Sequence, residues 1–343
     1  MIKFFRTIRK ELLTKNKIGK YLLYALGEII LVIVGILIAL NLNQRSEQKK
    51  AEAKIDAIFE DVLKDLETDI SRSTAYIDIY QRKDSLLSLV LNTDLTYKDY
   101  AKEDSDPIWR AALTMGFYTP SDNAHKVLMS NIDAIPEKYS QSVSFLNELH
   151  GTRRQSVERF NKRLNDHVIE SNDILAEKPW YTEPDHKKST EAIMYRLNDY
   201  RYKNRVKKYH GIVIRNHRRT ILFYRAHAVR CYEEIASVLN KMTDSLDFIT
   251  DEEVLNRYVG SYVRSTNHES KAEITINNDG FLIVNREHPL QEDGLIHVSS
   301  ESKFSSANPI GGVFIFNKSN LGDYITMTIH EGHIPVTYTK LNP

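Results

Sequence analysis

The pattern of hydrophobic and polar residues changes twice along the chain, and its clearest feature is an apolar run near the start. Residues 21–43 contain one charged side chain, Glu28. A helix needs roughly 20 apolar residues to cross the hydrocarbon of a bilayer, at about 1.5 Å per residue. The pattern therefore predicts a membrane-spanning helix over residues 21–43, with the rest of the chain attached to it.

Positive charge lies mainly on the N-terminal side of this run. A single acid, Glu11, accompanies the cations there, which are Lys3, Arg6, Arg9, Lys10, Lys15, Lys17 and Lys20. The positive-inside rule then places the N-terminus in the cytoplasm and residues from about Asn43 onward outside it. We expect a single-pass protein of a bacterial inner membrane with its C-terminal bulk in the periplasm.

A cleaved signal peptide is the alternative interpretation of the same run. The run is longer than the usual apolar region of a signal peptide, about 7–15 residues, and no small-x-small cleavage site follows before Asn43. An uncleaved signal anchor is therefore predicted. Residues 1–20 mix apolar and basic side chains, which fits either a short amphipathic helix on the lipids of the inner leaflet or a floppy basic tail.

Glu28 lies on one side of the predicted membrane helix together with two small residues. Gly35 and Ala39 follow it at helical spacing, so all three fall near one face. Gly35 and Ala39 form a small-xxx-small pair, which lets a second helix approach closely. We expect this face to pack against a partner helix, with Glu28 protonated or hydrogen-bonded there. The alternative is that Glu28 sits near the membrane boundary and reaches interfacial water.

Helical spacing continues after the apolar run, from Ser46 to about Leu91. No Pro or Gly interrupts it, and apolar residues recur at intervals of three and four: Ile55, Ile58, Phe59, Val62, Leu63, Leu66 and Ile70. The membrane helix is therefore expected to continue as a rigid stalk that ends at residues 92–94.

Two short helices are expected next. Asp106 and Pro107 predict the N-cap and the first position of a helix that reaches Met115. Ser121 is expected to cap another helix through Met129.

Two long helices are expected over residues 136–176 and 190–241, and with the stalk they predict an antiparallel helical bundle over residues 44–248. The second has a heptad-like stripe: Ile214, His217, Ile221, Tyr224, Ala228, Cys231, Ile235, Val238 and Met242. Because His217 and Cys231 belong to this stripe, we interpret both as core residues.

Charge is distributed unevenly between these helices. Acids dominate residues 52–69, whereas residues 196–230 are strongly basic and include a predicted basic face of Arg201, Arg205, Lys208, Arg215, Arg218, Arg219 and Arg225. Tyrosines interleave with these cations, which in a cytoplasmic protein would suggest nucleic acid. The expected topology argues against that partner. Mutual pairing of acidic and basic helices, within one bundle or between copies, is the leading interpretation, and an envelope lipid or glycan polyanion is another.

The pattern changes again near Asp251, where short alternating runs are separated by Asn, Asp and Gly. Residues 250–343 therefore predict a small antiparallel β-barrel or sandwich with hairpin turns at 278–280 and 331–332. The candidate strands are residues 260–264, 272–276, 281–285, 296–299, 312–317, 324–330 and 334–340.

This C-terminal region resembles a small lipocalin-like β domain that is appended to many bacterial hydrolases. The residues that carry the resemblance are Tyr258-Val-Gly260-Ser-Tyr262, Ile274-Thr-Ile276, Asn278-Asp-Gly280-Phe-Leu282, Phe304, Phe314 and Tyr338-Thr-Lys340-Leu341. No enzyme domain precedes it, so the resemblance implies a fold and not an activity.

The N-terminal half resembles a family of uncharacterised bacterial proteins that are anchored in the membrane and carry a helical exported region. The matching residues are Lys3-Phe4-Phe5-Arg6, Lys20-Tyr-Leu-Leu-Tyr24-Ala-Leu-Gly27-Glu28-Ile29 and Gly35-Ile-Leu-Ile-Ala39-Leu40. The resemblance implies that Glu28 is usual in the family, and it brings no known activity or catalytic residue.

Motifs that carry chemistry are few. His330-Glu331-Gly332-His333 is one residue short of the zinc motif H-E-x-x-H, and we interpret it as a surface turn. The chain has no phosphate-binding loop, dinucleotide fingerprint or nucleophile elbow. One cysteine excludes an intramolecular disulfide, and a formal net charge of +1 gives no bias toward nucleic acid. We expect no catalytic residue, no metal and no cofactor.

The sequence thus predicts an α+β protein with a membrane helix, a helical bundle and a β domain. The leading functional hypothesis is a non-enzymatic membrane-anchored subunit that forms homo-oligomers or scaffolds a larger envelope complex. The alternative is a periplasmic sensor whose β domain binds a ligand. A hydrolase is the third hypothesis, and it depends on the appended-domain resemblance alone.

Overall fold

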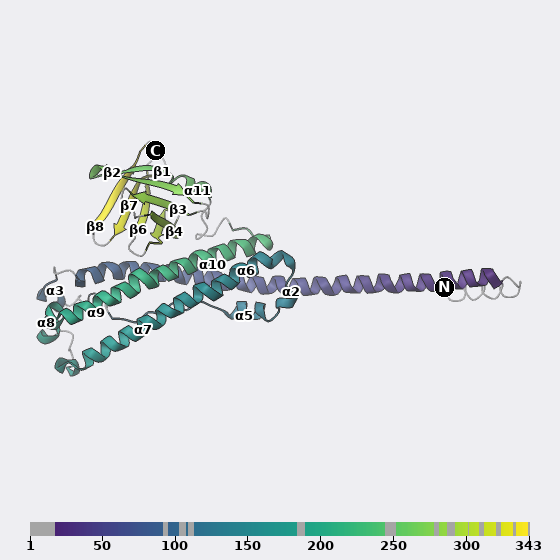
Figure 1. The fold of residues 1–343 in the computed structure, drawn as a ribbon, viewed down its shortest axis with the longest axis horizontal. Helices are drawn as coiled ribbons and strands as arrows, with labels where there is room; N and C mark the ends of the chain where they lie inside the picture. The colour runs from purple at the N-terminus through teal and green to yellow at the C-terminus, as the bar shows by residue number, and fades with distance from the viewer. Residues whose placement is uncertain are drawn as a thin grey trace. The chain divides into compact units, whose positions relative to one another are not determined.

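The fold is α+β, with helices first and a closed antiparallel barrel of eight strands after them, which confirms the fold class expected from the sequence (Figure 1). The chain forms two compact units, Met1–Ile58 with Asn131–Pro136, and Phe59–Ser130 with Glu137–Pro343. The computed structural model describes residues 18–91, 95–102, 108, 113–183, 189–243, 252–277, 281–286, 292–300, 302–308, 312–319, 324–331 and 334–341.

Several sequence-based expectations concern residues outside these ranges. They are the basic segment before residue 18, the end of the stalk at 92–94, the helix start at Asp106 and Pro107, the turn at 278–280, and the Gly332-His333 half of the histidine motif.

Helix α2 (Ile18–Leu91) joins the predicted membrane helix and the predicted stalk in one unbroken helix of 74 residues. In the first unit it carries the apolar run, and Lys54 Nζ donates to Asn131 Oδ1 at 3.0 Å beside the short helix η2 (Ile132–Ala134). From Phe59 onward most apolar positions of α2 are buried by the other helices of the second unit, whereas Ile79 and Leu89 are exposed.

The region between the long helices differs from the expectation. After α3 (Tyr97–Ala101), the helix expected to reach Met115 has no helical residue from Leu113 on: Leu113 has a positive φ of 59°, and residues 114–120 have no helical hydrogen bonds. Helix α5 (Asn123–Met129) has Asp122 at its N-cap and not Ser121. Ser121 instead donates its backbone N–H to the Asp69 carboxylate.

The first long helix is present with a local change of winding. It consists of η3 (Glu137–Tyr139), α6 (Ser140–Glu148), the π-helical segment η4 (Leu149–Arg153) and α7 (Arg154–Ala176). The expected stop at Pro179 is observed, where the short helix η5 (Pro179–Thr182) begins.

The second long helix is broken at Asp199, so its expected continuity is wrong. Helix α8 (Thr190–Asn198) ends there, and the Asp199 carboxylate accepts the N–H groups of Arg201 and Tyr202 to cap α9 (Tyr200–His210). The π-helical segment η7 (Gly211–His217) then leads into α10 (Arg218–Val238). An internal Asp prefers to cap a helix, and this local preference exceeded the longer apolar pattern.

Helix α10 ends in a left-handed turn. Asn240 has φ 54°, Lys241 N–H donates to Ala236 O at 2.8 Å, and Asn240 N–H donates to Ser237 O at 3.0 Å. This is a Schellman arrangement, which satisfies the last carbonyls of the helix.

Helix α2 runs antiparallel to α9 and α10 within the second unit. In the contacting pairs, residue numbers increase along α2 while they decrease along the other helices. The pairs are Glu67 with Tyr232, Asp69 with Tyr224, Tyr80 with His217 and Asp84 with His210. Helix α6 is antiparallel to α10 by the same criterion, because Phe145 contacts Arg230 and Glu148 contacts His227. The expected stripe is buried in this packing from Ile214 to Ile235, whereas Val238 is half-buried and Met242 is exposed.

The barrel is a meander in which each strand pairs antiparallel with the next, and β1 closes it by pairing with β8. The strands are β1 (Gly260–Arg264), β2 (Asn267–Ile276), β3 (Leu282–Arg286), β4 (Glu292–Ser300), β5 (Lys303–Ser306), β6 (Val313–Lys318), β7 (Tyr324–Glu331) and β8 (Ile334–Lys340). Seven were expected at overlapping positions, although β2 and β4 begin earlier than expected, at Asn267 and Glu292. Strand β5 was missed because one apolar residue, Phe304, gives four residues no alternation.

Gly260 is required where β1 begins. Its φ is +143°, and a Cβ there would lie 2.9 Å from Cε of Lys340 on β8. Only glycine adopts that conformation without strain, whereas the flexible end of the Lys340 side chain could move away from a Cβ.

Candidate functional surfaces

The first candidate surface is the apolar run of α2. Its large side chains are exposed, Leu31 by 68% and Ile38 by 56%, and none of its apolar window of 18 residues is buried. Among the described residues, α2 is the one helix that is both long enough and apolar enough to cross a membrane. An apolar surface of this extent is unfavourable in water, so it indicates a lipid or protein environment.

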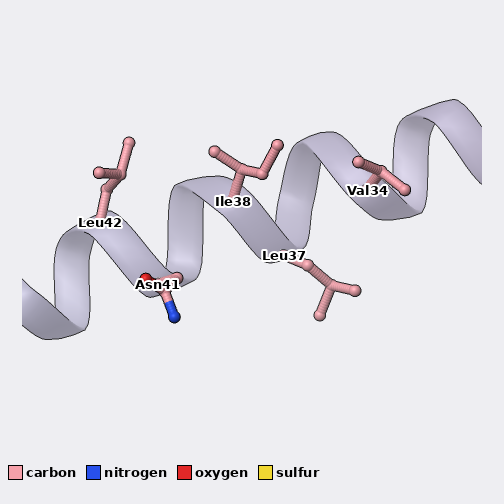
Figure 2. Close-up of a pocket in the computed structure, with 5 residues that line it drawn as sticks. All are labelled: Val34, Leu37, Ile38, Asn41 and Leu42. Carbon is pink, nitrogen blue, oxygen red and sulfur yellow. The ribbon is translucent and has the colours of Figure 1, made fainter.

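Glu28 is half-buried on this helix, and Gly35 and Ala39 are exposed. A Cβ added to Gly35 would meet nothing within 4 Å, so the surface at this glycine is open. A shallow hollow of about 310 Å³ lies elsewhere, between Val34, Leu37, Ile38, Asn41 and Leu42, whose side chains Figure 2 shows around the helix. At 3.6 residues per turn the hollow is centred about a third of a turn from the expected partner face.

The expected basic face is divided by the fold. Arg201, Lys208, Arg215 and Arg219 are exposed, Arg205 is half-buried, and Arg218 and Arg225 are buried. The division arises because α9, the π-helical η7 and α10 turn successive residues to different sides. Among the described residues, Lys208 pairs with Glu170 of α7 at 3.5 Å, and His210 of α9 lies 2.7 Å from Asp84 of α2.

Arg225 connects the helices to the barrel. Its side chain is 2% exposed; Nε donates to Thr74 Oγ1 at 2.8 Å, and Nη1 donates to the carbonyl oxygen of His297 on β4. Burial lowers its pKa to about 10, so the guanidinium remains charged at neutral pH. Lys303 on β5 adds a 2.6 Å ion pair to Asp78 of α2. Arg225 is therefore a structural residue.

A polar groove lies between α7 and the α9–η7 helices. Its volume is about 380 Å³, and its lining comprises Arg159, Lys162, Arg163, Asp166, His167, Glu170, Lys208 and Ile212. The α7 residues recur at intervals of three and four, which places them on one face. The sequence reasoning missed the α7 cations because it scored regional charge excess, and the acids of α7 offset them. Charge scored along one helix face would have found them.

A buried carboxylate organises the centre of the helical region. Asp69 is 1% exposed; its oxygens accept the Ser121 N–H at 3.1 and 2.9 Å and the Tyr224 hydroxyl at 2.8 Å. Burial raises its pKa, which these hydrogen bonds partly oppose.

Residues 113–121, which we call the strap, cross the helices with their carbonyl oxygens paired to side chains. Tyr76 donates to Phe117 O at 2.5 Å, and the other donors to the strap are Tyr80 to Gly116 O, Asn161 to Tyr118 O and Tyr209 to Thr114 O. These bonds replace the backbone ladder that the strap lacks, so they explain how an irregular segment is held against the helices.

Burial shifts the pKa values of several ionisable groups in the helical region. Lys83 Nζ donates to Thr114 Oγ1 at 2.6 Å and to Tyr209 Oη at 2.8 Å, and burial lowers its pKa to about 8. His217 bonds the Tyr80 hydroxyl at 2.8 Å, with a pKa lowered by burial to about 4. Burial raises the pKa of Cys231 to about 12, so its thiol stays protonated. Both His217 and Cys231 lie in the core, where their sequence interpretation put them.

The barrel interior is filled by side chains. The aromatic residues Tyr258, Tyr262, Phe304, Phe314, Phe316, Tyr324 and Tyr338 pack there with aliphatic neighbours and with Leu255 of α11 (Glu252–Asn256). Ring centroids of Tyr258 lie 4.4 Å from Tyr324 and 4.5 Å from Phe316. An eight-stranded barrel either fills its interior or holds one small ligand. Here aromatic rings occupy that space.

Among the described residues, no three His, Cys, Asp or Glu side chains gather as metal ligands. His330 lies within β7, in a strand and not on a helix, so it lacks the geometry of the zinc motif. Comparisons with family models, with curated proteins and with solved structures gave no match.

Proposed function

We propose that this protein is a non-enzymatic, membrane-anchored subunit of the bacterial envelope. It crosses the inner membrane once through α2, keeps its C-terminal bulk in the periplasm, and assembles with copies of itself or with other membrane subunits. The apolar, exposed surface of α2 carries the proposal, because such a surface needs lipid or another helix to cover it.

Two further features support an assembly role. The apolar run and residues 59–91 belong to one continuous helix, α2, so a partner bound to the run would be linked to the rest of the chain without an intervening loop. The barrel interior is filled by aromatic side chains, which supports a structural role for this domain over a ligand-binding one.

Assembly is tested by extracting native membranes in a mild detergent and measuring the size of the complex. We expect a species larger than the monomer, and Gly35→Leu is expected to reduce it, because a leucine there blocks close helix approach. Gly27→Leu is the matched control: it lies about a quarter of a turn from Gly35, and a Cβ at either glycine meets nothing within 4 Å. A monomer without partners, or equal loss in both variants, would refute the proposal.

Topology is tested with reporters fused after residue 341. A reporter active only in the periplasm is expected to function there, and a cytoplasmic reporter is expected to be silent. The opposite result would place the helical region and the barrel in the cytoplasm, and the proposed envelope role would fail. The mature N-terminal sequence provides the second check, because an uncleaved anchor retains residues 21–43.

A further inference from the structure

The groove between α7 and the α9–η7 helices has the composition of a ligand site rather than of an ordinary exposed face. Arg159, Lys162 and Arg163 lie at one end of its α7 wall, and Asp166 and Glu170 lie at the other. Within the described part of the chain, these three cations form no ion pair with an acid. A ligand with an anionic group would meet three exposed cations on one helix face that form no ion pair among the described residues.

His167 adds an observation that points to a ligand. The residue is 3% exposed, and its Nε2 lies 3.0 Å from the carbonyl oxygen of Arg205. A carbonyl oxygen only accepts, so Nε2 carries the hydrogen, and neutral His167 presents Nδ1 as an acceptor. That atom is buried with no hydrogen-bond partner, 3.9 Å from Glu170 Oε2 at the groove.

The two ends of the groove therefore offer different chemistry. Arg159, Lys162 and Arg163 can bind anions, whereas Asp166 and Glu170 can accept hydrogen bonds from hydroxyl groups, and the buried Nδ1 atom of His167 is an unpaired acceptor beside Glu170. Burial lowers the pKa of His167, which keeps the ring neutral and Nδ1 an acceptor at neutral pH. Lys208 lies 3.5 Å from Glu170 and supplies a further donor at the hydroxyl-binding end.

From this arrangement we infer that the groove binds an acidic saccharide. Its carboxylate or phosphate groups contact Arg159, Lys162 and Arg163, and its hydroxyl groups donate to Asp166 and Glu170. A nucleic acid fits less well, because single strands bind through aromatic stacking and the one apolar residue in the lining is Ile212. This inference is independent of the proposed assembly role, and each can fail alone.

The test is calorimetric titration of the full chain in a polyoxyethylene detergent, since a maltoside detergent would itself present sugar hydroxyls. The probes are trigalacturonic acid, neutral maltotriose, inorganic phosphate, and vesicles of phosphatidylglycerol in phosphatidylcholine. We expect saturable binding of trigalacturonic acid and weaker binding of the other probes. Tighter binding of phosphate alone, or binding to the vesicles alone, would overturn the inference in favour of a simple anion or a lipid.

Paired variants separate the two ends of the groove. Arg159→Ala with Arg163→Ala is expected to weaken trigalacturonic acid binding by about tenfold or more, since each lost bond involves a charged group. Lys207→Ala with Arg215→Ala is the control: both residues are exposed outside the lining, so screening should limit the effect to about twofold. Equal losses in the two pairs would overturn the inference.

Variants at the acidic end of the groove distinguish a saccharide site from a site that only attracts anions, because the two predict opposite changes in affinity for trigalacturonic acid. Asp166→Asn with Glu170→Gln is expected to weaken trigalacturonic acid binding by about tenfold, because each charged carboxylate acceptor becomes a neutral amide with a single oxygen. The same pair should strengthen binding of inorganic phosphate, because two negative charges leave the groove. Tighter binding of trigalacturonic acid by this variant would show that the groove reads charge alone. Both carboxylates are exposed, so the fold should be retained, as a thermal melt of each variant would verify.

Discussion

Asp69 gives the sharpest stability prediction, because its environment separates the loss of hydrogen bonds from the loss of charge. Asp69→Ala removes the acceptor of the Ser121 N–H and of the Tyr224 hydroxyl. Each buried donor left unpaired costs about 1–3 kcal/mol, and the relief of a buried charge offsets part of the total. We expect Asp69→Ala to lower the free energy of unfolding by about 2–4 kcal/mol.

Asp69→Asn keeps an oxygen for Ser121 and places an amide N–H₂ beside the Tyr224 oxygen, so we expect it to cost less. The pH dependence follows from the raised pKa of Asp69 in the folded protein. The folded state then holds this proton more tightly than the unfolded state does. The cost of ionisation is absent below the unfolded pKa, grows as the pH rises toward the folded pKa, and is constant above it. Asp69→Asn should therefore gain stability relative to the wild type as the pH rises.

Urea unfolding of the full chain in detergent, followed by far-UV circular dichroism between about pH 3.5 and pH 8, measures both effects, since the pH dependence begins near the unfolded pKa of about 3.9. Asp61→Asn is the matched control, since Asp61 is exposed on the same helix and pairs with Lys64 at 2.8 Å; no measurable change is expected there. If the wild type instead becomes more stable relative to Asp69→Asn as the pH rises, the hydrogen bonds to the carboxylate outweigh its burial and the reasoning is refuted.

Three further predictions concern the helix–barrel contact, the barrel closure and a helix end. Arg225→Ala should lower the free energy of unfolding by about 2–4 kcal/mol in a thermal or urea melt, because a cavity opens and the His297 carbonyl loses its donor. Arg225→Met should lower it by less, and equal losses of stability in the two variants would contradict this explanation. Gly260→Ala should cost about 1–3 kcal/mol in the same melt through its positive φ, and a neutral result would show that the backbone readjusts. Asn240→Ala should cost about 1 kcal/mol, whereas Asn240→Gly should not, and equal melts would count against a left-handed cap.

The sequence predicted the elements that depend on local periodicity. Helix α2 and seven strands were found because their apolar spacing continues over enough residues to distinguish periods of 3.6 and 2. Strand β5 was missed because it is short and its neighbours, not its own pattern, place it in the barrel. The break at Asp199 was missed because a cap of one residue competes with a long apolar pattern.

The surfaces were less predictable than the elements. Arg218 and Arg225 read as members of a charged face, but packing against α2 and β4 buries them, which no count of charges along the chain reveals. The groove required two helices to be brought together, so its lining could not be assembled from one stretch of sequence. The strap depends wholly on side chains from distant helices, and its own residues give little sign of it.

The meander order of the barrel has a kinetic consequence. Seven of its eight strand pairings join neighbours in the chain, and these hairpins can form early because little loop entropy is lost. The pairing of Tyr262 with Lys340 joins residues far apart and involves only three residues of β1, so closure is expected to be the last event of folding. Until that seam forms, β1 and β8 are open edges, and the nascent sheet is most exposed to aggregation at that stage.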